Sequence, residues 1–556
     1  MARSAVFRSE EEAPKKPTHL GLSQFNDVIN LKGEVSQRTL TYLDSTASAL
    51  ASRRIQKAVK LFLEEDYANT HTEGHHRGRD STEAVNAARD AVGQLVNYNP
   101  MEDVVIFKGT GATGPLNYLA EVLFPKELRH LMNPKMSSIL RKENIELLPE
   151  AKRIIAEQMI EKPIIITTEM EHHANLLPWY NEHVKIVHVN PKTGELDLDE
   201  LEHLLKEHAG QVRLVSVSGA SNVTGIRNPI HDIAKMAHAA GAEICVDAAQ
   251  LAPHHRIEKR RADSREDLDY IVMSPHKFGV PNTPGVFIGN RSLIQARRGL
   301  SDLGGGMVNT VSAYPPEYTI ADDLAAGEEA GTPNIPGIVA TGLAAALLAR
   351  NMPKLVVHEQ ELTCSLMKKL QEETLRDGVQ IIGSTDPSKR VGVVSVSVND
   401  VPHEIVTAYL NDHWNIAVRN GCFCAHPLII TTSGVSPSDI ERIKQGDRSN
   451  IPGYVRISFG EHNTQKDVDT VIEALTELVK NKEAVLGLYE VGLHGTAVRK
   501  DGFTQSRGWS FEEAVERIDS AQVAEEEQRA MPSKWSERVG QPNSSADISK
   551  SKRVML

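Results

Sequence analysis

The sequence predicts an α/β fold, with a large domain built on a mostly parallel sheet and a second, smaller α+β domain. At 556 residues, 40% of them hydrophobic and 24% charged, the chain exceeds one ordinary domain and has the composition of a globular protein. From about residue 36, short apolar runs alternate with amphipathic helical stretches, which is typical of parallel sheets. The strand pattern restarts near residue 385, which indicates the second domain.

Each predicted strand is a short, nearly continuous apolar run, as expected for strands buried on both faces. In the large domain the runs are 104–107, 164–167, 214–217, 243–246, 270–273 and 286–288, and the smaller domain has one at 393–398. Capping signals predict a helix from Asp80 to Asn97 and another that has Asn228 as its cap and Gly241 as its stop. A helix near 464–479 closes the smaller domain.

Five parts are expected along the chain. A mobile tail precedes the large domain, which contains a helical insertion. Connecting helices then lead to a small domain with a cysteine loop, and a polar extension follows. The expected bounds are 1–25 for the tail, 26–310 for the large domain with its insertion at about 125–162, 311–384 for the connecting helices, 385–485 for the small domain and 486–556 for the extension.

Composition argues against several classes of function. The net charge of −12 makes a general attraction to nucleic acid or to an anionic membrane unexpected, and no uninterrupted apolar run is long enough to cross a bilayer. Four cysteines cannot form a disulfide framework in so long a chain, so we expect the cytoplasm, with a mitochondrial location left open. The cysteine pair at 422 and 424 has no second pair to complete a zinc site, so no metal is expected.

Candidate active-site residues follow the ends of predicted strands, where ligands bind in α/β sheets. Lys277 comes shortly after the run 270–273, and a lysine there can form a Schiff base if burial lowers its pKa, although such a lysine is usually only solvated. Asp247 ends the preceding run, and a buried carboxylate needs a cation. The pyridinium nitrogen of pyridoxal phosphate (PLP) is such a cation, and Gln250 could hydrogen-bond the ring hydroxyl. The alternative for Asp247 is an N-cap of the following segment.

Two more strand ends carry candidates. After 104–107, the segment KGTGATG brings glycines and the hydroxyls of Thr110 and Thr113 to a helix start, which fits either a phosphate cradle or an ordinary glycine-rich turn. It is not a Walker motif, because no Gly-Lys-Ser/Thr follows. His172 follows the run 164–167, where an imidazole could stack on a cofactor ring or simply lie on the surface.

These residues lie in segments that resemble the class V aminotransferase family of fold-type I PLP enzymes, specifically its Suf-type cysteine desulfurases and selenocysteine lyases. The matching segments are YLDSTASAL (42–50), EMEHHANLLPW (169–179), SNVTGIRNP (221–229), VDAAQLAPHH (246–255), SPHKFGVP (274–281), GTPNIPG (331–337) and RNGCFCAHP (419–427). They keep the family's order over roughly residues 36–480. The resemblance implies a seven-stranded, mostly parallel sheet in the large domain.

The resemblance also implies cofactor-binding roles. Lys277 carries PLP, Asp247 holds its ring nitrogen, Gln250 binds its ring oxygen and His172 stacks on the ring. Asn222 lies near the ring oxygen and the substrate. The phosphate is bound by Thr113, Ser274 and His276, with Thr110 as the alternative threonine, and Thr332 serves the phosphate of a neighbouring subunit, which implies a homodimer.

For the substrate, the resemblance implies that Arg456 grips the carboxylate, a task that suits a fork-shaped cation. His71 is similar to a further active-site histidine. Cys424 stands where desulfurases place the nucleophile that takes sulfur from cysteine, whereas Cys422 fits a packing residue. A lowered thiol pKa would need a nearby cation, for which Arg419 is a candidate, as is His426.

Some features are similar to other branches of the family. The TGAT loop, RNGCFC and VRISFG resemble the PLP domain of molybdenum-cofactor sulfurases. The expected substrate is a small amino acid, L-cysteine, with a sulfur-acceptor protein as a further partner. The alternatives are another class V reaction (C–S lyase, selenocysteine lyase, epimerase or aminotransferase) and a non-catalytic protein of the same fold.

Overall fold

The computed structural model describes residues 19–22, 24–124, 163–180, 182–296, 302–445, 451–492, 495–505 and 509–519. The chain divides into two units, 1–504 and 505–556, and in the second the described residues form helix α17 (Phe511–Asp519). The predicted insertion at 125–162 and most of the predicted tail at 1–25 lie outside the described residues.

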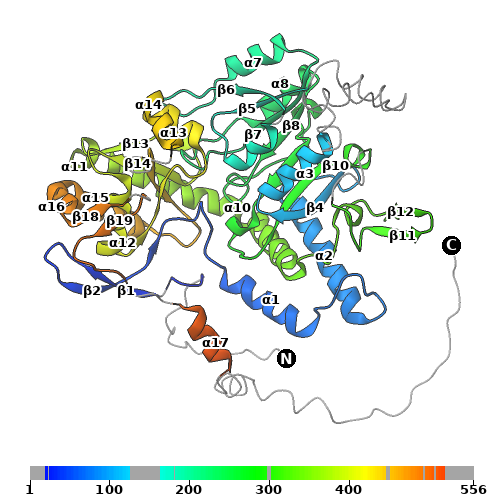
Figure 1. Ribbon diagram of the computed structural model, residues 1–556, viewed down its shortest axis with the longest axis horizontal. Coiled ribbons are helices and arrows are strands. Elements are labelled where there is room, and N and C mark those ends of the chain that lie inside the picture. Colours follow the sequence, from blue (N-terminus) through cyan, green and yellow to red (C-terminus); the bar gives the residue numbers. More distant parts are fainter. Residues whose placement is uncertain are drawn as a thin grey trace, which may run out of the picture. The chain divides into compact units, whose positions relative to one another are not determined.

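A seven-stranded sheet forms the centre of the large domain (Figure 1). Its order is β4 (Asp103–Thr110), β10 (Pro284–Asn290), β9 (Tyr270–Met273), β8 (Glu243–Asp247), β7 (Val212–Ser218), β5 (Ile164–Thr168) and β6 (His183–Val187). Only β10 is antiparallel to its neighbours, and the pairs from β9 to β6 are all parallel. The predicted mostly parallel sheet is confirmed.

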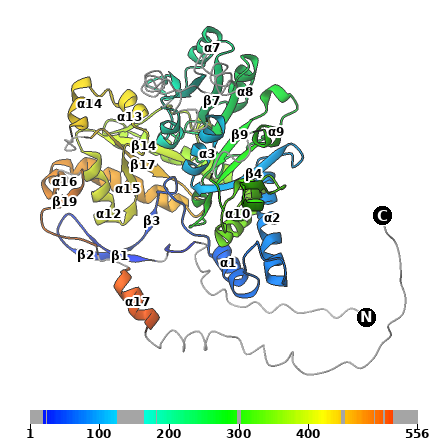
Figure 2. The same cartoon turned by 45° about the vertical axis from the view of Figure 1, so that its right-hand side comes forward.

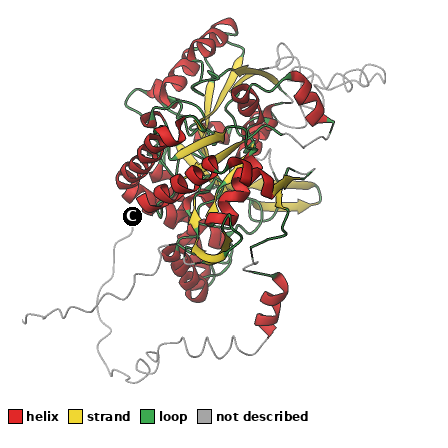
Figure 3. Ribbon diagram, turned by 90° about the vertical axis from the view of Figure 1, so that its left-hand side faces the viewer, coloured by secondary structure: helices red, strands yellow, loops and turns green. Residues whose placement is uncertain are grey.

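Both faces of this sheet are buried, which explains why its strands are continuous apolar runs. On β9, Ile271 and Met273 belong to one core cluster, and Tyr270 and Val272 belong to another. The first cluster includes residues of α2 (His76–Leu95), α8 (Ile230–Ala239) and α10 (Ile335–Leu370), and the second those of α3 (Thr113–Leu123). Figure 3 shows the strands flanked by helices.

Two predicted helix starts are wrong. Helix α2 begins at His76 rather than Asp80, because the side chain of His75 accepts a hydrogen bond from the Gly78 amide and caps it. Helix α8 has Pro229 rather than Asn228 at its N-cap. Other boundaries hold: β14 (Val393–Val398) matches the predicted strand, and α15 (Gln465–Lys480) follows a capping box.

The small domain contains a four-stranded sheet in the order β13 (Val379–Ile381), β14, β17 (Tyr454–Ser458) and β16 (Arg419–Gly421) (Figure 2). Helices α12 (His403–Trp414) and α15 share its core cluster. Leu43 belongs to this cluster too, and β3 (Thr41–Tyr42) pairs with β15 (Ile416–Ala417). The chain next to residue 43 therefore packs with the small domain, although the sequence placed it in the large one.

The stretch 311–384 does not consist of helices alone. It contains β13 and most of the hairpin β11 (Val308–Ala313) and β12 (Pro316–Ile320) beside helix α10. A second hairpin, β18 (Tyr489–Val491) and β19 (Ala497–Arg499), begins the stretch predicted as a polar extension.

Helix α10 has 36 residues and is long and apolar enough to cross a membrane by length and composition. The sequence did not predict this, because charged residues interrupt the apolar run. Half of its most apolar 18-residue segment is buried, and the helix packs against α1 (Arg53–Glu65), α2 and α15. Its apolar character is explained by this packing, which joins both domains.

Candidate active site

A cavity of about 450 Å³ lies at the carboxyl ends of the parallel strands. Strands β4, β5, β7 and β8 all end at this edge, and the segment after β9 completes the wall. Among the residues that line it are eleven of the predicted site: Thr110, Thr113, His172, Asn222, Asp247, Gln250, Ser274, His276, Lys277, Arg419 and Arg456. The fold therefore brings together residues from seven separate segments of the chain.

Asp247 and Lys277 supply a buried acid and a basic nucleophile to one cavity. Asp247 ends β8 with 4% of its surface exposed, and its carboxylate accepts a hydrogen bond from the Ala249 amide at 2.9 Å. Burial raises the pKa of Asp247. Burial lowers the pKa of Lys277 to about 8, against the opposing attraction of Asp247. A substantial neutral fraction of this amine near neutral pH makes it a competent nucleophile.

Gln250 is held beside Lys277 by a residue that the sequence did not single out. The Lys277 Nζ donates to Gln250 Oε1 at 3.4 Å, and Gln250 Nε2 donates to the Thr46 hydroxyl at 3.1 Å. Thr46 lines the same cavity. This arrangement fixes the orientation of the Gln250 amide, as a ring-oxygen contact would require.

The glycine loop has the geometry of an anion cradle. Gly109 and Gly111 have φ of +49° and +52°, which L side chains rarely adopt. A Cβ atom on Gly111 would come within 3.3 Å of the Ser274 hydroxyl, a tight contact that adds to the backbone preference for glycine. The Ala112 amide donates to Ser274 Oγ at 2.7 Å, and α3 begins at Thr113. The loop, the Ser274 hydroxyl and a helix N-terminus thus converge on one wall of the cavity.

His172 faces the cavity as a neutral imidazole. Its Nδ1 accepts a hydrogen bond from the Ala174 amide at 3.0 Å, so the proton of the neutral ring resides on Nε2. Burial, and next the charge of Lys277, lower the pKa of His172 to about 4. A neutral ring suits stacking against a cofactor better than a charged one beside a lysine.

Behind His172 lies a buried carboxylate that the sequence did not predict. Glu171 accepts hydrogen bonds from the hydroxyls of Thr168 and Ser218, from the Ser218 amide and from Asn175 Nδ2, at 2.6–2.9 Å. Burial raises its pKa to about 7. Ser218 lines the cavity, so this network ties the ends of β5 and β7 together beneath His172. The available signal was an acidic residue directly before the candidate histidine.

Arg456 is presented by β17 with 1% of its surface exposed. Its Nη2 donates to Asp44 at 3.0 Å and its Nη1 to the Asn222 carbonyl at 3.0 Å, while no described atom accepts from its Nε. The ring of Phe423 lies 4.7 Å from the guanidinium. Burial lowers the pKa of Arg456 to about 10, opposed by Asp44. With Arg419, it forms a cationic wall suited to a carboxylate.

Three predicted site residues do not line this cavity: Cys424, His71 and Thr332. Phe423 lines the cavity in place of its neighbour Cys424. His71 and Thr332 are exposed and lie close together, since Asn69 Nδ2 donates to the Thr332 hydroxyl at 3.1 Å and His71 Nε2 lies 3.4 Å from the Gly331 carbonyl oxygen. The predicted role of His71 in the active site gains no support from this placement, and the predicted role of Thr332 toward the phosphate of a neighbouring subunit stays a prediction.

Cys422 and the possible metal ligands are the remaining candidates. Cys422 is partly buried and packs against the large-domain core cluster, as a packing residue would. Within the described ranges, no group of three or more His, Cys, Asp or Glu residues has a metal-binding arrangement.

Known proteins resemble this chain over most of its length. A cysteine desulfurase from Cronobacter sakazakii is 29% identical over 463 residues, which cover 82% of this chain and 97% of that protein. A probable cysteine desulfurase from Staphylococcus epidermidis is 30% identical over 455 residues, covering 80% and 94%. A solved apo structure of a cysteine desulfurase from Thermococcus onnurineus superposes with a TM-score of 0.62 at 25% identity, covering 79% and 94%. The model of the aminotransferase class-V family matches residues 41–133 and 150–471, and this chain belongs to that family.

Proposed function

We propose that this chain uses PLP to convert L-cysteine to L-alanine and that the sulfur remains as a persulfide on Cys424. The overall change is balanced: cysteine and a thiol give alanine and a persulfide. The printed names of the relatives support the reaction, and the observation that carries the proposal is the joint presence of Asp247 and Lys277 in one cavity.

The residues present fit PLP. Asp247 is a buried carboxylate at the cavity wall, and burying such a group is costly unless a cation meets it. The protonated pyridine nitrogen would supply that cation. The glycine loop with Gly111 and Thr113, together with Ser274, would hold the phosphate. Gln250 would bind the ring oxygen, and His172 would pack on one face of the ring. When bound, PLP withdraws electrons from bonds at the substrate α-carbon.

The chain's own groups perform the remaining tasks. Arg456 and Arg419 bind the substrate carboxylate and so orient the α-carbon. Lys277, with its pKa lowered to about 8, would hold the cofactor, and its free amine could accept the substrate α-proton at Nζ. The Cys424 thiolate then attacks the substrate sulfur, the C–S bond breaks, and a proton returned to carbon completes alanine.

The test is alanine release from L-cysteine by the full-length protein with PLP. Cys424→Ser should abolish turnover while the yellow cofactor absorbance remains, because the nucleophile is lost and the cofactor site is intact. Cys422→Ser is the matched control, two residues away in the same loop, and should retain activity. Unchanged turnover in Cys424→Ser would remove the persulfide from the proposal.

One observation favours a second candidate, a class V reaction that needs no thiol. Cys424 does not line the cavity, and an aminotransferase or C–S lyase would not require it to. Incubation with amino acids and a panel of keto acids would produce new amino acids if the chain is a transaminase. Alanine production without any keto acid supports the desulfurase.

We also propose a homodimer in which Thr332 contributes to the phosphate site of the partner. Thr332 is exposed and does not line the cavity of its own chain, and the β11–β12 hairpin exposes Val311 by 71% and Tyr314 by 95%. Light scattering should give twice the chain mass, and Thr332→Ala should weaken PLP retention.

A reducing compartment such as the cytoplasm, with a sulfur-acceptor protein, completes the proposal, and fractionation of cells would test the compartment.

A further inference from the structure

The loop around Cys424 has an uncommon backbone. Phe423 and Cys424 are consecutive and have φ of +53° and +58°, in the left-handed region that non-glycine residues rarely occupy. Such a backbone conformation is strained for a non-glycine residue and persists only where surrounding contacts hold it. The loop therefore needs restraints on both sides of the cysteine.

The first restraint acts on Phe423. Asn222 Nδ2 donates to the Phe423 carbonyl at 2.7 Å, and the Phe423 ring packs under the Arg456 guanidinium at 4.7 Å. Phe423 is 3% exposed and forms part of the cavity wall. It occupies the position beside the carboxylate-binding arginine, where the proposed reaction needs a thiol.

The second restraint is a pair of histidines that brackets Cys424. The His173 amide donates to the Cys424 carbonyl at 2.7 Å. The His426 amide donates to His173 Nε2 at 3.3 Å, and His426 Nδ1 lies 2.8 Å from that same nitrogen, with the two rings stacked at 4.7 Å. Because His173 Nε2 accepts from the amide, His426 Nδ1 must carry the proton that completes the second bond.

We propose that His173 and His426 form a latch that holds the loop with Phe423 against the cavity and Cys424 outside it, and that opening this latch lets Cys424 replace Phe423 beside the substrate. The inference rests on the proposed function, because only a thiol-dependent reaction requires Cys424 at the cavity. Neither histidine lines the cavity, so both are positioning residues that act through the loop.

The geometry gives the latch a specific chemical requirement. A hydrogen-bond donor must stand at the place of His426 Nδ1, and an acceptor at His173 Nε2. Asparagine can present its Nδ2–H near the position of an imidazole Nδ1–H, whereas alanine cannot. His426→Ala should therefore open the latch and His426→Asn should keep it closed. His426 is exposed, so neither change disturbs the core.

The test is the rate at which iodoacetamide alkylates Cys424 in the full-length protein with its cofactor, read by peptide mass spectrometry in a Cys422→Ser background. We expect His426→Ala to accelerate alkylation about tenfold, the factor that corresponds to one hydrogen bond, and His426→Asn to restore the slow rate. Circular dichroism and cofactor absorbance verify that each variant is folded. Equal alkylation rates in all three proteins, each folded, would overturn the latch.

Alanine release separates this inference from the proposed function. If His426→Ala accelerates both alkylation and the single-turnover formation of the Cys424 persulfide, and His426→Asn reverses both effects, the latch is supported. If alanine release is normal but alkylation does not respond, the latch fails and the function stands. If neither the wild type nor any variant forms alanine or a persulfide, the proposed function fails, and the proposed replacement of Phe423 by Cys424 beside the substrate fails with it.

Discussion

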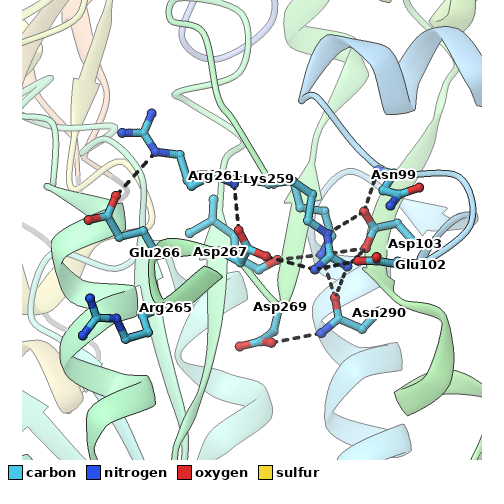
Figure 4. A network of polar contacts seen from close by, with 12 residues as sticks. Asn99, Glu102, Asp103, Lys259, Arg261, Arg265, Glu266, Asp267, Asp269 and Asn290 are labelled. Carbon is cyan, nitrogen blue, oxygen red and sulfur yellow. Dashed lines mark hydrogen bonds and ion pairs between the residues drawn. The ribbon is translucent and has the colours of Figure 1, made fainter. Parts of the chain in front are cut away.

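Two sites in the large domain each place a buried carboxylate near a lysine. They lie at opposite strand ends of the same sheet and differ in how the charges are paired. At the end of the sheet where β4 begins, Asp103 and Lys259 are both fully buried, and Lys259 Nζ lies 3.0 Å from Asp103 Oδ1 (Figure 4). At the edge where β8 ends, Asp247 and Lys277 lie in the walls of a cavity.

The difference lies in how completely the protein pairs the charges. Lys259 Nζ donates to the Leu268 carbonyl at 2.6 Å and to Asn290 at 2.8 Å as well as to Asp103, which also accepts from Arg260 and the Asn99 amide. Among the described residues, the Asp247 carboxylate accepts from one amide, at 2.9 Å, and the Lys277 amine makes one hydrogen bond, at 3.4 Å.

Removing one member of a saturated network of buried charges destabilises the fold, because another buried group loses its partner. An unsaturated set at a cavity wall leaves capacity for a ligand that completes it. In this chain, the number of partners of a buried charge thus distinguishes a structural site from a binding site. Substitutions at each of the two sites test this distinction.

The largest effect should come from Asp247→Asn. This change preserves the bond from the Ala249 amide but removes the charge, so we expect alanine release to fall by at least about 100-fold. The urea midpoint of the cofactor-free protein should stay the same or rise, because a costly buried charge is lost. A lower midpoint together with normal turnover would mean that Asp247 is structural.

Lys259→Met should give the opposite pattern. It removes one of the two cations that pair with the buried Asp103, together with the donor to the Leu268 carbonyl, so we expect the free energy of unfolding to fall by about 1–3 kcal/mol, while turnover per folded molecule is unchanged. Lys235→Met is the matched control, because Lys235 forms ion pairs on the surface and its loss should change the urea midpoint little. Similar urea midpoints for the two variants would contradict the distinction.

Glu171→Gln should have a smaller effect that depends on pH. The pKa of Glu171 is raised from 4.5 to about 7, so the folded protein binds a proton that the unfolded chain releases between these values. This contribution to stability is fully present below pH 4.5 and is lost as the pH rises through about 7. The wild-type urea midpoint should therefore fall relative to that of the variant as the pH rises over this window, and a constant difference would refute the assignment.

The mildest test follows the rate at which PLP binds covalently to the cofactor-free protein. Only the neutral amine of Lys277 reacts, so the rate should rise with pH to a midpoint near 8. A midpoint near the ordinary lysine value of 10.5 would contradict the role of burial. Lys277→Ala should show no covalent binding at any pH.

The sequence predicted the parts of the fold that depend on local pattern. The strand runs were recognisable because both faces of the sheet are buried, and glycine loops and strand ends identified Gly111, Asp247 and Lys277. The start of α2 was missed because its cap is the side chain of His75, which is not a residue type that capping rules favour.

The missed site residues depend on contacts that no local pattern encodes. Asp44 meets Arg456 across 412 positions of sequence, and Asn222 meets Phe423 across 201. The position of Cys424 outside the cavity depends on two consecutive left-handed residues, which sequence rules would not assign to phenylalanine and cysteine.

The central claim is that Lys277 carries the aldehyde cofactor of this cavity, and reduction followed by peptide mapping tests it most directly. The full-length protein, loaded with PLP and treated with borohydride, should yield a phosphopyridoxyl group on the peptide that contains Lys277. Attachment to another lysine, or no attachment while the protein remains folded, would contradict the account.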